Sequence, residues 1–303
     1  MSTEKHNPSG HIIQSLIVNL VIAISKGFAA FMTLSGAMLA ETIHSFSDCA
    51  NQALLLLGVK QAQRVPDEKH PMGYGRAVYF WSFMVAMLLF TIGGMFSIYE
   101  GVHKFTHPEP VENVLWGVGI LVFSILLEGY ATYSNIVELN TRRGKTSFSK
   151  YIRQTKDSSL VVIFAENSAA MLGLVLALVA LLVAYYTHDG RYDAVGSIGI
   201  GVVLVAVAIF LAVEVKSLLI GEAADPIIGE HAADIAARHP NIHSLLQCIT
   251  IQQGPGEVLA CIKLRIEPNL TTNEVIALIN DFETQLREVC PDVIWLFVEP
   301  DLV

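Results

Sequence analysis

The segment with the clearest capacity for chemistry reads ETIHSFSDCANQALLLLG and covers residues 41–58. Its polar residues Glu41, His44, Asp48 and Asn51 or Gln52 are spaced by three and four, so they fall on one side of an α-helix. His44 and Asp48 place an imidazole and a carboxylate one turn apart, which suits two ligands of a divalent metal ion. The alternative is a hydrogen-bonded cluster that holds neighbouring helices together.

The surrounding sequence is that of a membrane protein. Of its 303 residues, 53% are hydrophobic and 16% are charged, which is too apolar for an ordinary soluble domain. A membrane-spanning helix needs about 20 residues, and the runs that reach this length are Ile12–Leu34, Ala37–Val59, Val78–Val102, Val114–Val137, Ser159–Tyr186 and Ala194–Leu219. The first run has no small-residue cleavage site, so we expect no removed signal peptide.

The depth of the polar residues links the second run to the fifth. An ionisable side chain at the centre of a bilayer costs at least ~2.5–3.5 kcal/mol, so the polar stripe should face protein or water. Glu166 and Asn167 lie near the middle of the fifth run, at a depth similar to that of Asp48. A third carboxylate at this level makes a four-ligand site possible, although Glu166 could instead be a paired structural carboxylate. Glu41 lies one turn to the outer side of His44 and could guide departing ions.

The basic residues predict the orientation. They gather in the connection after the second run and in the connection after the fourth, as Lys60, Arg64, Lys69, Arg76, Arg142, Arg143, Lys145, Lys150, Arg153 and Lys156. Because short cytoplasmic loops carry the excess of lysine and arginine, we expect both termini to be cytoplasmic. We therefore predict a cytosolic tail at 1–11, a six-helix transmembrane domain at 12–220 and a cytosolic C-terminal domain at 221–303.

The last eighty or so residues have the pattern of a small soluble domain. Apolar residues at helical spacing precede Pro240, two strand-like stretches flank the turn QGPG, and Thr271 or Thr272 can cap a helix that begins near Glu274. The stretch DVIWLFVEP reads as a final strand. Two helices and three strands predict an α+β domain of the ferredoxin-like or metallochaperone-like kind, with one sheet and its helices on one face.

Several classes of function are disfavoured by composition and motifs. A net charge of −9 and a pI near 5.5 argue against nucleic-acid binding. The cysteines form no CxxC pair, and the chain contains neither a phosphate-binding GxxxxGK[ST] loop nor an HExxH motif. We therefore expect neither an enzyme nor a protein with a prosthetic group.

These segments together resemble the cation diffusion facilitator family. The resemblance rests on TLSGAMLAETIHSFSDCANQALLLLG, DEKHPMGYGRAVYFWSF, GEAADP and FVEPD, in this order, and covers nearly the whole chain. The variant motifs look like the bacterial branch related to zinc transporter nine. The resemblance implies a homodimeric exporter in the bacterial inner membrane that exchanges a divalent metal ion for protons by alternating access, around a site on the second and fifth helices.

The resemblance also assigns residues by position. His44 and Asp48 match the second-helix metal ligands. On the fifth helix Asn167 stands where the family has its aspartate and Ile163 stands where it has its histidine, and we expect the adjacent acid Glu166 to replace the missing ligand. The family's fifth-helix histidine is absent, so Mn²⁺, Fe²⁺, Co²⁺ and Cd²⁺ join Zn²⁺ as candidate cargo.

Two further groups of residues follow from the same comparison. Asp67 and His70 match a loop metal site, for which a simple polar turn is the alternative. Arg76 is expected to pair with Glu222 or Asp225 and so to brace either the dimer or the junction between the membrane domain and the tail. A competing interpretation of the whole chain is a non-transporting membrane scaffold or regulator with a degenerate metal site; an intramembrane metallohydrolase is disfavoured because no nucleophile lies beside a base.

Overall fold

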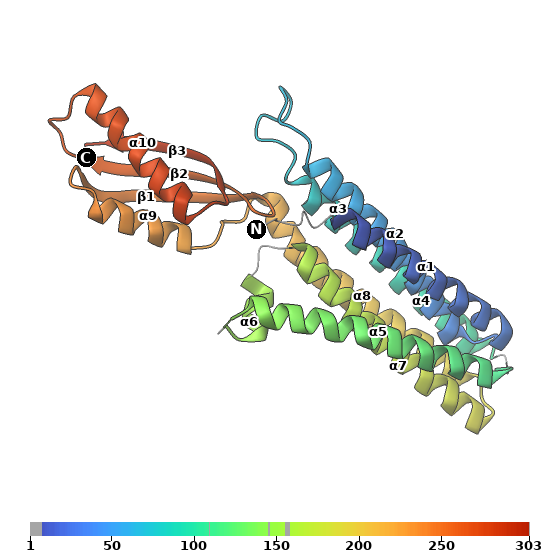
Figure 1. Ribbon diagram of the computed structural model, residues 1–303. Helices are drawn as coiled ribbons and strands as arrows, with labels where there is room; N and C mark the ends of the chain where they lie inside the picture. The colour runs from blue at the N-terminus through green and yellow to red at the C-terminus, as the bar shows by residue number, and fades with distance from the viewer. Residues whose placement is uncertain (1–7, 109, 145, 155–157, 303) are drawn as a thin grey trace, which may run out of the picture. The chain divides into compact units, whose positions relative to one another are not determined.

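Figure 1 shows the computed structural model, which describes residues 8–108, 110–144, 146–154 and 158–302. The chain divides into two compact units. The helical unit comprises Met1–Gly58 and Phe80–Val215, and the C-terminal unit comprises Val59–Tyr79 and Lys216–Val303. Residues 1–7 of the predicted N-terminal tail, and Lys145 and Lys156 of the predicted basic loop, lie outside the described residues. The predicted domain boundaries at 12 and 221 stay predictions.

All six predicted apolar runs form helices. The elements are α1 (Pro8–Thr33), α2 (Gly36–Ala62), α3 (Ala77–Leu88), the π-helix η1 (Leu89–Met95), α4 (Phe96–Thr106), α5 (Val114–Arg142), α7 (Ser158–Thr187) and α8 (Arg191–Ile220). The third run is therefore interrupted by η1 rather than being one regular α-helix. A short helix that the sequence did not predict, α6 (Phe148–Gln154), lies in the basic connection before α7.

Within the described residues, four helical stretches are long and apolar enough to cross a membrane. They are Ala77–Thr106, Val114–Thr141, Ile163–Thr187 and Arg191–Ile220. The polar-striped α2 is not among them, and α1 contributes a shorter apolar helix, Asn19–Thr33. In the helical unit Trp116 and Lys150 lie at opposite ends, and Trp116 is 61% exposed, as expected for an aromatic anchor at a membrane interface. Six crossings remain a prediction.

Glycines let α8 approach the π-helical region closely. A Cβ atom added to Gly94 would lie 2.6 Å from Val205 Cγ2, and one added to Gly201 would lie 2.7 Å from Ile98 Cγ1. Small residues at such positions allow the van der Waals contact that drives helix association in lipid. Side chains larger than hydrogen would push η1 and α4 away from α8.

A buried carboxylate fixes the beginning of α2. Asp193 of α8 accepts hydrogen bonds from the Ser35 hydroxyl at 2.6 Å and from the Gly36 N–H at 2.6 Å. A negative charge at a helix N-terminus is favourable because it satisfies free N–H groups and opposes the helix dipole. From α4, Lys104 donates to the Leu34 carbonyl at 2.5 Å. The turn between α1 and α2, which has no charge of its own, is thus held by charges from elsewhere in the helical unit.

The C-terminal unit contains the predicted α+β domain. It is built from α9 (Ile227–Arg238), β1 (Ile242–Gly254), β2 (Glu257–Ile266), α10 (Thr272–Val289) and β3 (Val293–Asp301). The sheet order is β1-β2-β3, with β1 antiparallel and β3 parallel to β2. The predicted cap is confirmed, because Thr271 and Glu274 form a reciprocal capping box at the start of α10.

One face of this sheet carries the core. Alternate residues of β2, including Ala260, Ile262 and Leu264, are buried with Ala232 of α9 and Phe282 of α10. Successive residues of a strand point to opposite faces, so these alternate residues all lie on one face of the sheet. Since they form one core with residues of both α9 and α10, the two helices cover that same face, as predicted (Figure 1).

Replacement of Asp193 by alanine tests the cap on α2. We expect Asp193→Ala to lower the free energy of unfolding of the helical unit by about 1–2 kcal/mol, because the Ser35 and Gly36 donors lose their acceptor. Thermal unfolding of the detergent-solubilised protein measures the effect. The control is Asp189→Ala, which removes only a local bond to the Arg191 N–H in a partly exposed turn. Equal effects of the two variants would contradict the assignment.

Candidate metal centre

The polar stripe of α2 faces the interior of the helical unit. Glu41, His44 and Asn51 are each 0% exposed, whereas Phe46 on another side of the same helix is 44% exposed. Asp48 keeps 16% side-chain exposure. The helix therefore presents its chemistry inward and its large apolar side chains outward, which is the arrangement expected for a functional stripe in lipid.

The stripe contains buried polar atoms that lack partners. The Nδ1 atom of His44 lies 3.6 Å from Asp48 Oδ1, beyond hydrogen-bond distance. Both ring nitrogens of His44, together with Asp48 Oδ1 and Asn51 Oδ1, have no hydrogen-bond partner. Unpaired buried polar atoms are costly and uncommon in folded proteins. Imidazole nitrogen, carboxylate oxygen and amide oxygen are all donors that divalent metals accept, so this group of atoms fits a cation.

Helix α7 brings the third carboxylate beside this stripe. The Asn51 amide nitrogen donates to Glu166 Oε1 at 2.7 Å, and Glu166 is 7% exposed. Glu166 is also close enough to Asp48 for the two charges to interact. Asn167, the next residue of α7, is partly buried. Asn51 therefore joins α2 to α7 directly. Its position on the stripe predicted that it faces protein or water, but did not identify Glu166 as its partner.

The predicted ligands do not form a complete cage in this conformation. Among the described residues, no three His, Cys, Asp or Glu side chains are grouped so that they could hold a metal ion. His44 and Asp48 are adjacent, while Glu166 Oε1 is engaged by Asn51. The four-residue site of His44, Asp48, Glu166 and Asn167 therefore stays a prediction.

A buried ion pair lies beside the stripe. Lys26 of α1 is 0% exposed and its ammonium group lies 3.2 Å from Glu41 Oε2 and 2.8 Å from Ser45 Oγ. The other oxygen of Glu41 lies against Gly173 of α7, where an added Cβ atom would overlap it. Glu41 is therefore held by α1 and α7 together, and its predicted role in guiding ions stays a prediction. Lys26 lies in an apolar run, and no local pattern in the sequence identifies its partner.

In the loop between α2 and α3, Asp67 organises a turn. Its Oδ1 atom accepts the N–H groups of Lys69 at 3.0 Å and His70 at 2.7 Å, and its Oδ2 atom accepts the Tyr74 hydroxyl at 2.6 Å. The Tyr74 hydrogen bond is the first cause that lowers the pKa of Asp67 from its usual value. These contacts favour the polar-turn interpretation of the Asp67 and His70 pair, and a metal site there stays a prediction.

The proposed charge interlock involves residues of the C-terminal unit. The Nη2 atom of Arg76 would lie 3.5 Å from a Cβ atom added to Gly221, which places the guanidinium beside the residue before Glu222. Asp225 Oδ1 accepts the Ile227 N–H at 3.0 Å at the start of α9. The pairing of Arg76 with Glu222 or Asp225 stays a prediction.

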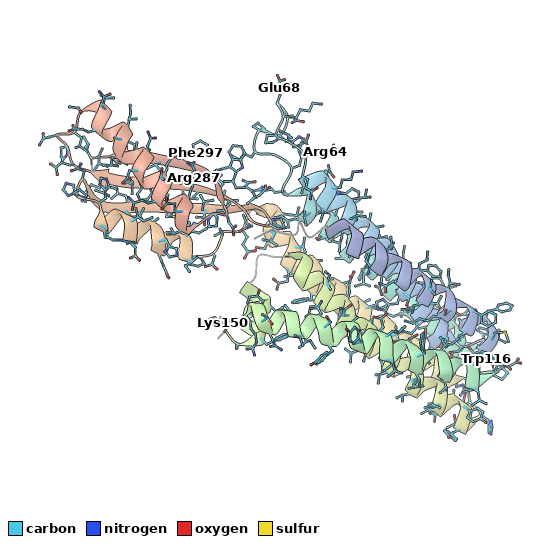
Figure 2. All side chains as sticks on the ribbon, in the orientation of Figure 1. Arg64, Glu68, Trp116, Lys150, Arg287 and Phe297 are labelled. Carbon is cyan, nitrogen blue, oxygen red and sulfur yellow. The ribbon has the colours of Figure 1, made fainter. Side chains whose placement is uncertain are left out.

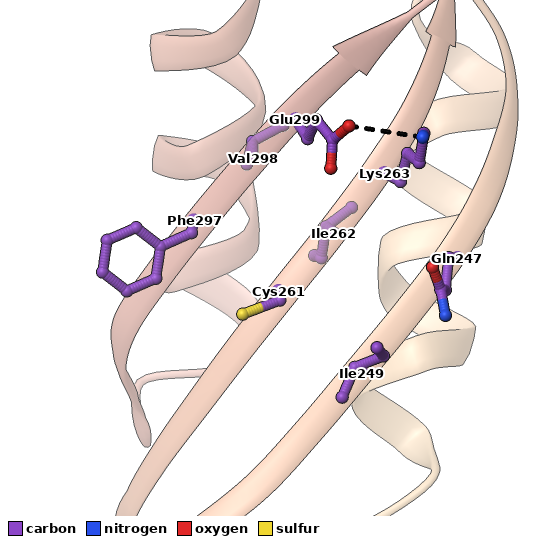
Figure 3. A pocket seen from close by; sticks show the side chains of 8 residues that line it. All are labelled: Gln247, Ile249, Cys261, Ile262, Lys263, Phe297, Val298 and Glu299. Atoms are coloured by element: carbon purple, nitrogen blue, oxygen red, sulfur yellow. Dashed lines mark ion pairs between the residues drawn. The ribbon is translucent and has the colours of Figure 1, made fainter.

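The uncovered face of the sheet carries a lysine-centred charge cluster. Lys263 lies 3.2 Å from Glu299 and 2.7 Å from Asp301, and Figure 3 shows the Lys263–Glu299 pair above Cys261 and Phe297. The hydrogen bond to Asp301 is the first cause that raises the pKa of Lys263. Both carboxylates are therefore paired with the same lysine, whose single charge offsets one of their two negative charges.

The Asn51–Glu166 hydrogen bond can be tested by removal of its donor. We expect Asn51→Ala to lower the free energy of unfolding by about 1 kcal/mol, the usual scale for hydrogen bonds between membrane helices. Glu166→Gln is the matched variant, because a glutamine oxygen can still accept from Asn51, so it should unfold close to the parent. Urea or detergent-induced unfolding followed by circular dichroism provides the measurement, and an unchanged Asn51→Ala protein would contradict the contact.

The Asp67 turn gives a prediction on pH. Because the Tyr74 hydroxyl stabilises the carboxylate, Tyr74→Phe should raise the pKa of Asp67 toward its usual value, so that Asp67 becomes protonated at a higher pH. The carboxyl-carbon chemical shift of Asp67, followed by NMR across pH 2–6, reports this value. A curve identical to that of the parent would show that the hydroxyl does not stabilise the charge.

Comparison with known proteins places the chain in a family. Residues 12–220 match the model of the cation efflux transmembrane domain. The chain is 30% identical over 284 residues to the proton-coupled zinc antiporter SLC30A9, mitochondrial, of Homo sapiens, which covers 93% of this chain and 50% of that protein. It is 29% identical over 253 residues to the uncharacterized transporter MJ0449 of Methanocaldococcus jannaschii, and the match covers 77% of this chain and 82% of that protein.

A third relative is the magnetosome protein MamB of Paramagnetospirillum magneticum, at 24% identity over 287 residues, covering 93% of this chain and 90% of that protein. The chain spans about half the length of the zinc antiporters that it matches. Its match to the cation efflux domain covers more than half of its own residues and contains the polar stripe, Glu166 and the Lys26–Glu41 pair. The chain is an integral membrane protein that belongs to the cation efflux, or cation diffusion facilitator, family of metal transporters.

Proposed function

We propose that this protein exports a divalent metal cation in exchange for protons, by alternating access around His44, Asp48, Glu166 and Asn167. The observation that carries the proposal is the set of unpartnered buried atoms on His44, Asp48 and Asn51, beside the Glu166 carboxylate of α7. A cation that sheds its water can satisfy these atoms. Membership of the cation efflux family supports the same conclusion.

Zn²⁺ is the first candidate for the cargo. The relatives named as zinc antiporters support it, and zinc accepts imidazole and carboxylate ligands in a four-coordinate site. One imidazole with several oxygen ligands is a harder donor set than the usual zinc site, so Mn²⁺, Fe²⁺, Co²⁺ and Cd²⁺ are the alternatives to be tested. Glu166 can contribute although Asn51 engages its Oε1 atom, because a carboxylate has a second oxygen.

Protons and metal compete for the same groups in this mechanism. Only neutral imidazole and ionised carboxylate bind a metal ion, so the cargo displaces any proton on His44, Asp48 or Glu166. A proton that returns to one of these atoms weakens its bond to the cargo and favours release. Because the site holds either cargo or protons, transport in one direction draws protons in the other, without a nucleotide.

The direction of access is part of the proposal. Asp48 retains exposure and lies on the side of His44 toward the C-terminal end of α2, while the fully buried Lys26–Glu41 pair lies on the opposite side. The basic residues that follow α2 predict that this end is cytoplasmic. We therefore infer that cargo reaches the site from the cytoplasm, with both termini on that side of a bacterial inner membrane.

A homodimer completes the proposed assembly. The uncovered face of the sheet exposes Ile249 and Phe297, at 48% and 54%, in a unit that folds around a core of its own. Residues 12–220 then form the transport domain and residues 221–303 the dimerisation domain. The partners that we propose are a second copy of the chain, membrane lipid, the metal cargo and protons, with no nucleic acid.

A scaffold or regulator is the second candidate function. It is favoured by the lack, among the described residues, of three metal-binding side chains already grouped together. Such a protein would keep the fold and the Lys26–Glu41 pair but would not need Asp48. Whether the protein needs Asp48 therefore distinguishes a transporter from a scaffold or regulator.

Reconstituted transport tests the proposal. The purified parent, Asp48→Ala and Glu166→Gln are placed in proteoliposomes with an imposed pH gradient, and uptake of Zn²⁺, Mn²⁺, Fe²⁺, Co²⁺ and Cd²⁺ is measured separately. We expect gradient-driven flux in the parent and a loss of at least about tenfold in both variants, since each loses a charged ligand.

The choice of Glu166→Gln sharpens the test. Glutamine can keep the bond to Asn51 and remove only the negative charge, so a loss of flux reports ligand charge rather than helix packing. Flux that persists in Glu166→Gln would remove Glu166 from the site. Absence of flux for every metal in a well-folded parent would favour the scaffold.

A further inference from the structure

Lys26 is an unusual residue for its position in the helical unit. Among the residues whose burial the structure describes, it is the only lysine or arginine that is fully enclosed. A buried ammonium group is tolerated only when it is paired and hydrogen-bonded, and here Glu41 and Ser45 of α2 supply both contacts. Loss of Glu41 would leave the ammonium charge uncompensated in an apolar surrounding.

The positive charge of Lys26 also acts on residues other than its direct partners. Its charge acts on His44 and Asp48 of the stripe and on Glu128 of α5, beyond its hydrogen-bonded partners Glu41 and Ser45. Glu41 also acts on Asp48, with the opposite sign. Inside protein, charges interact over longer distances than in water because they are poorly screened. The metal stripe therefore lies within the field of a fixed positive and a fixed negative charge.

We propose that Lys26 is a tethered counter-cation that sets the affinity of the His44–Asp48 site for its divalent cargo, with Glu41 as the opposing charge. This inference rests on the proposed metal site and adds two residues that tune it without touching the metal. Lys26 neutralises one of the surrounding carboxylates permanently, so the cargo meets less negative charge than the carboxylates alone would offer. A carrier needs this limit, because a site that binds too tightly does not release its cargo.

The proposal makes a prediction of sign that a purely structural ion pair does not make. Lys26→Met, which keeps the length and apolar stem, should bind metal about tenfold more tightly, because Glu41 is left as an extra negative charge. Glu41→Gln, which keeps the shape, should bind about tenfold more weakly, because the ammonium group is left uncompensated. The double variant should return to within about threefold of the parent.

The measurement is isothermal titration of the full chain in lipid nanodiscs with Zn²⁺ alone. Asp48→Ala is titrated in parallel, so that any binding outside the stripe is subtracted. Lys26→Arg is the conservative variant, which keeps the charge and should keep the parental affinity. Thermal unfolding of each variant is recorded in the same nanodiscs, and Glu41→Gln keeps the proposal testable if Lys26→Met does not fold.

The possible results separate this inference from the proposed function. Opposite shifts for Lys26→Met and Glu41→Gln, with recovery in the double variant, would support the tethered cation. A parent that binds at the stripe, with Lys26→Met of unchanged or weaker affinity, would overturn the inference and leave the metal site intact. If the parent and Asp48→Ala bind Zn²⁺ alike, the site itself is wrong and both proposals fail.

Discussion

The constraint on which the helical unit depends is the cost of polar groups within an apolar environment. Helix α2 carries Glu41, His44, Asp48 and Asn51 on one side, and each must face protein because lipid offers no hydrogen bonds. The structure meets this demand with groups from other helices. Lys26 of α1 neutralises Glu41, and Asn51 bonds to Glu166 of α7, so the polar stripe determines which helices surround α2.

The rest of the helical unit keeps these contacts in place. Asp193 fixes the N-terminal end of α2 to α8, and the glycine contacts between α8 and η1 bring the third apolar run close. Gly173 leaves space for the carboxylate of Glu41 against α7. These are short-range contacts of small residues and buried acceptors, and in lipid they replace the hydrophobic driving force that water gives a soluble protein.

The C-terminal unit follows different physics. Its core forms by burial of alternate strand residues such as Ala260 and Leu264 under two amphipathic helices, as in any soluble α+β domain. Lys263 is paired with Glu299 and Asp301 on the opposite face. The single charge of Lys263 offsets one of these two negative charges, and the same face exposes the apolar residues Ile249 and Phe297.

The sequence by itself determined the long helices, the C-terminal strands and the chemistry of α2, although it did not predict η1 or α6. Long apolar runs predict helices in lipid. Strand-like stretches predict the strands of the C-terminal domain, and the cap at Thr271 predicts the start of α10. All of these signals are local in the sequence. The spacing of His44 and Asp48 likewise follows from one helix. Tertiary structure alone decided the partners: Lys26 for Glu41, Asn51 for Glu166 and Asp193 for the start of α2. These pairs are separated by 15, 115 and 158 residues, and the geometry that joins them comes from helix packing, which no local pattern encodes.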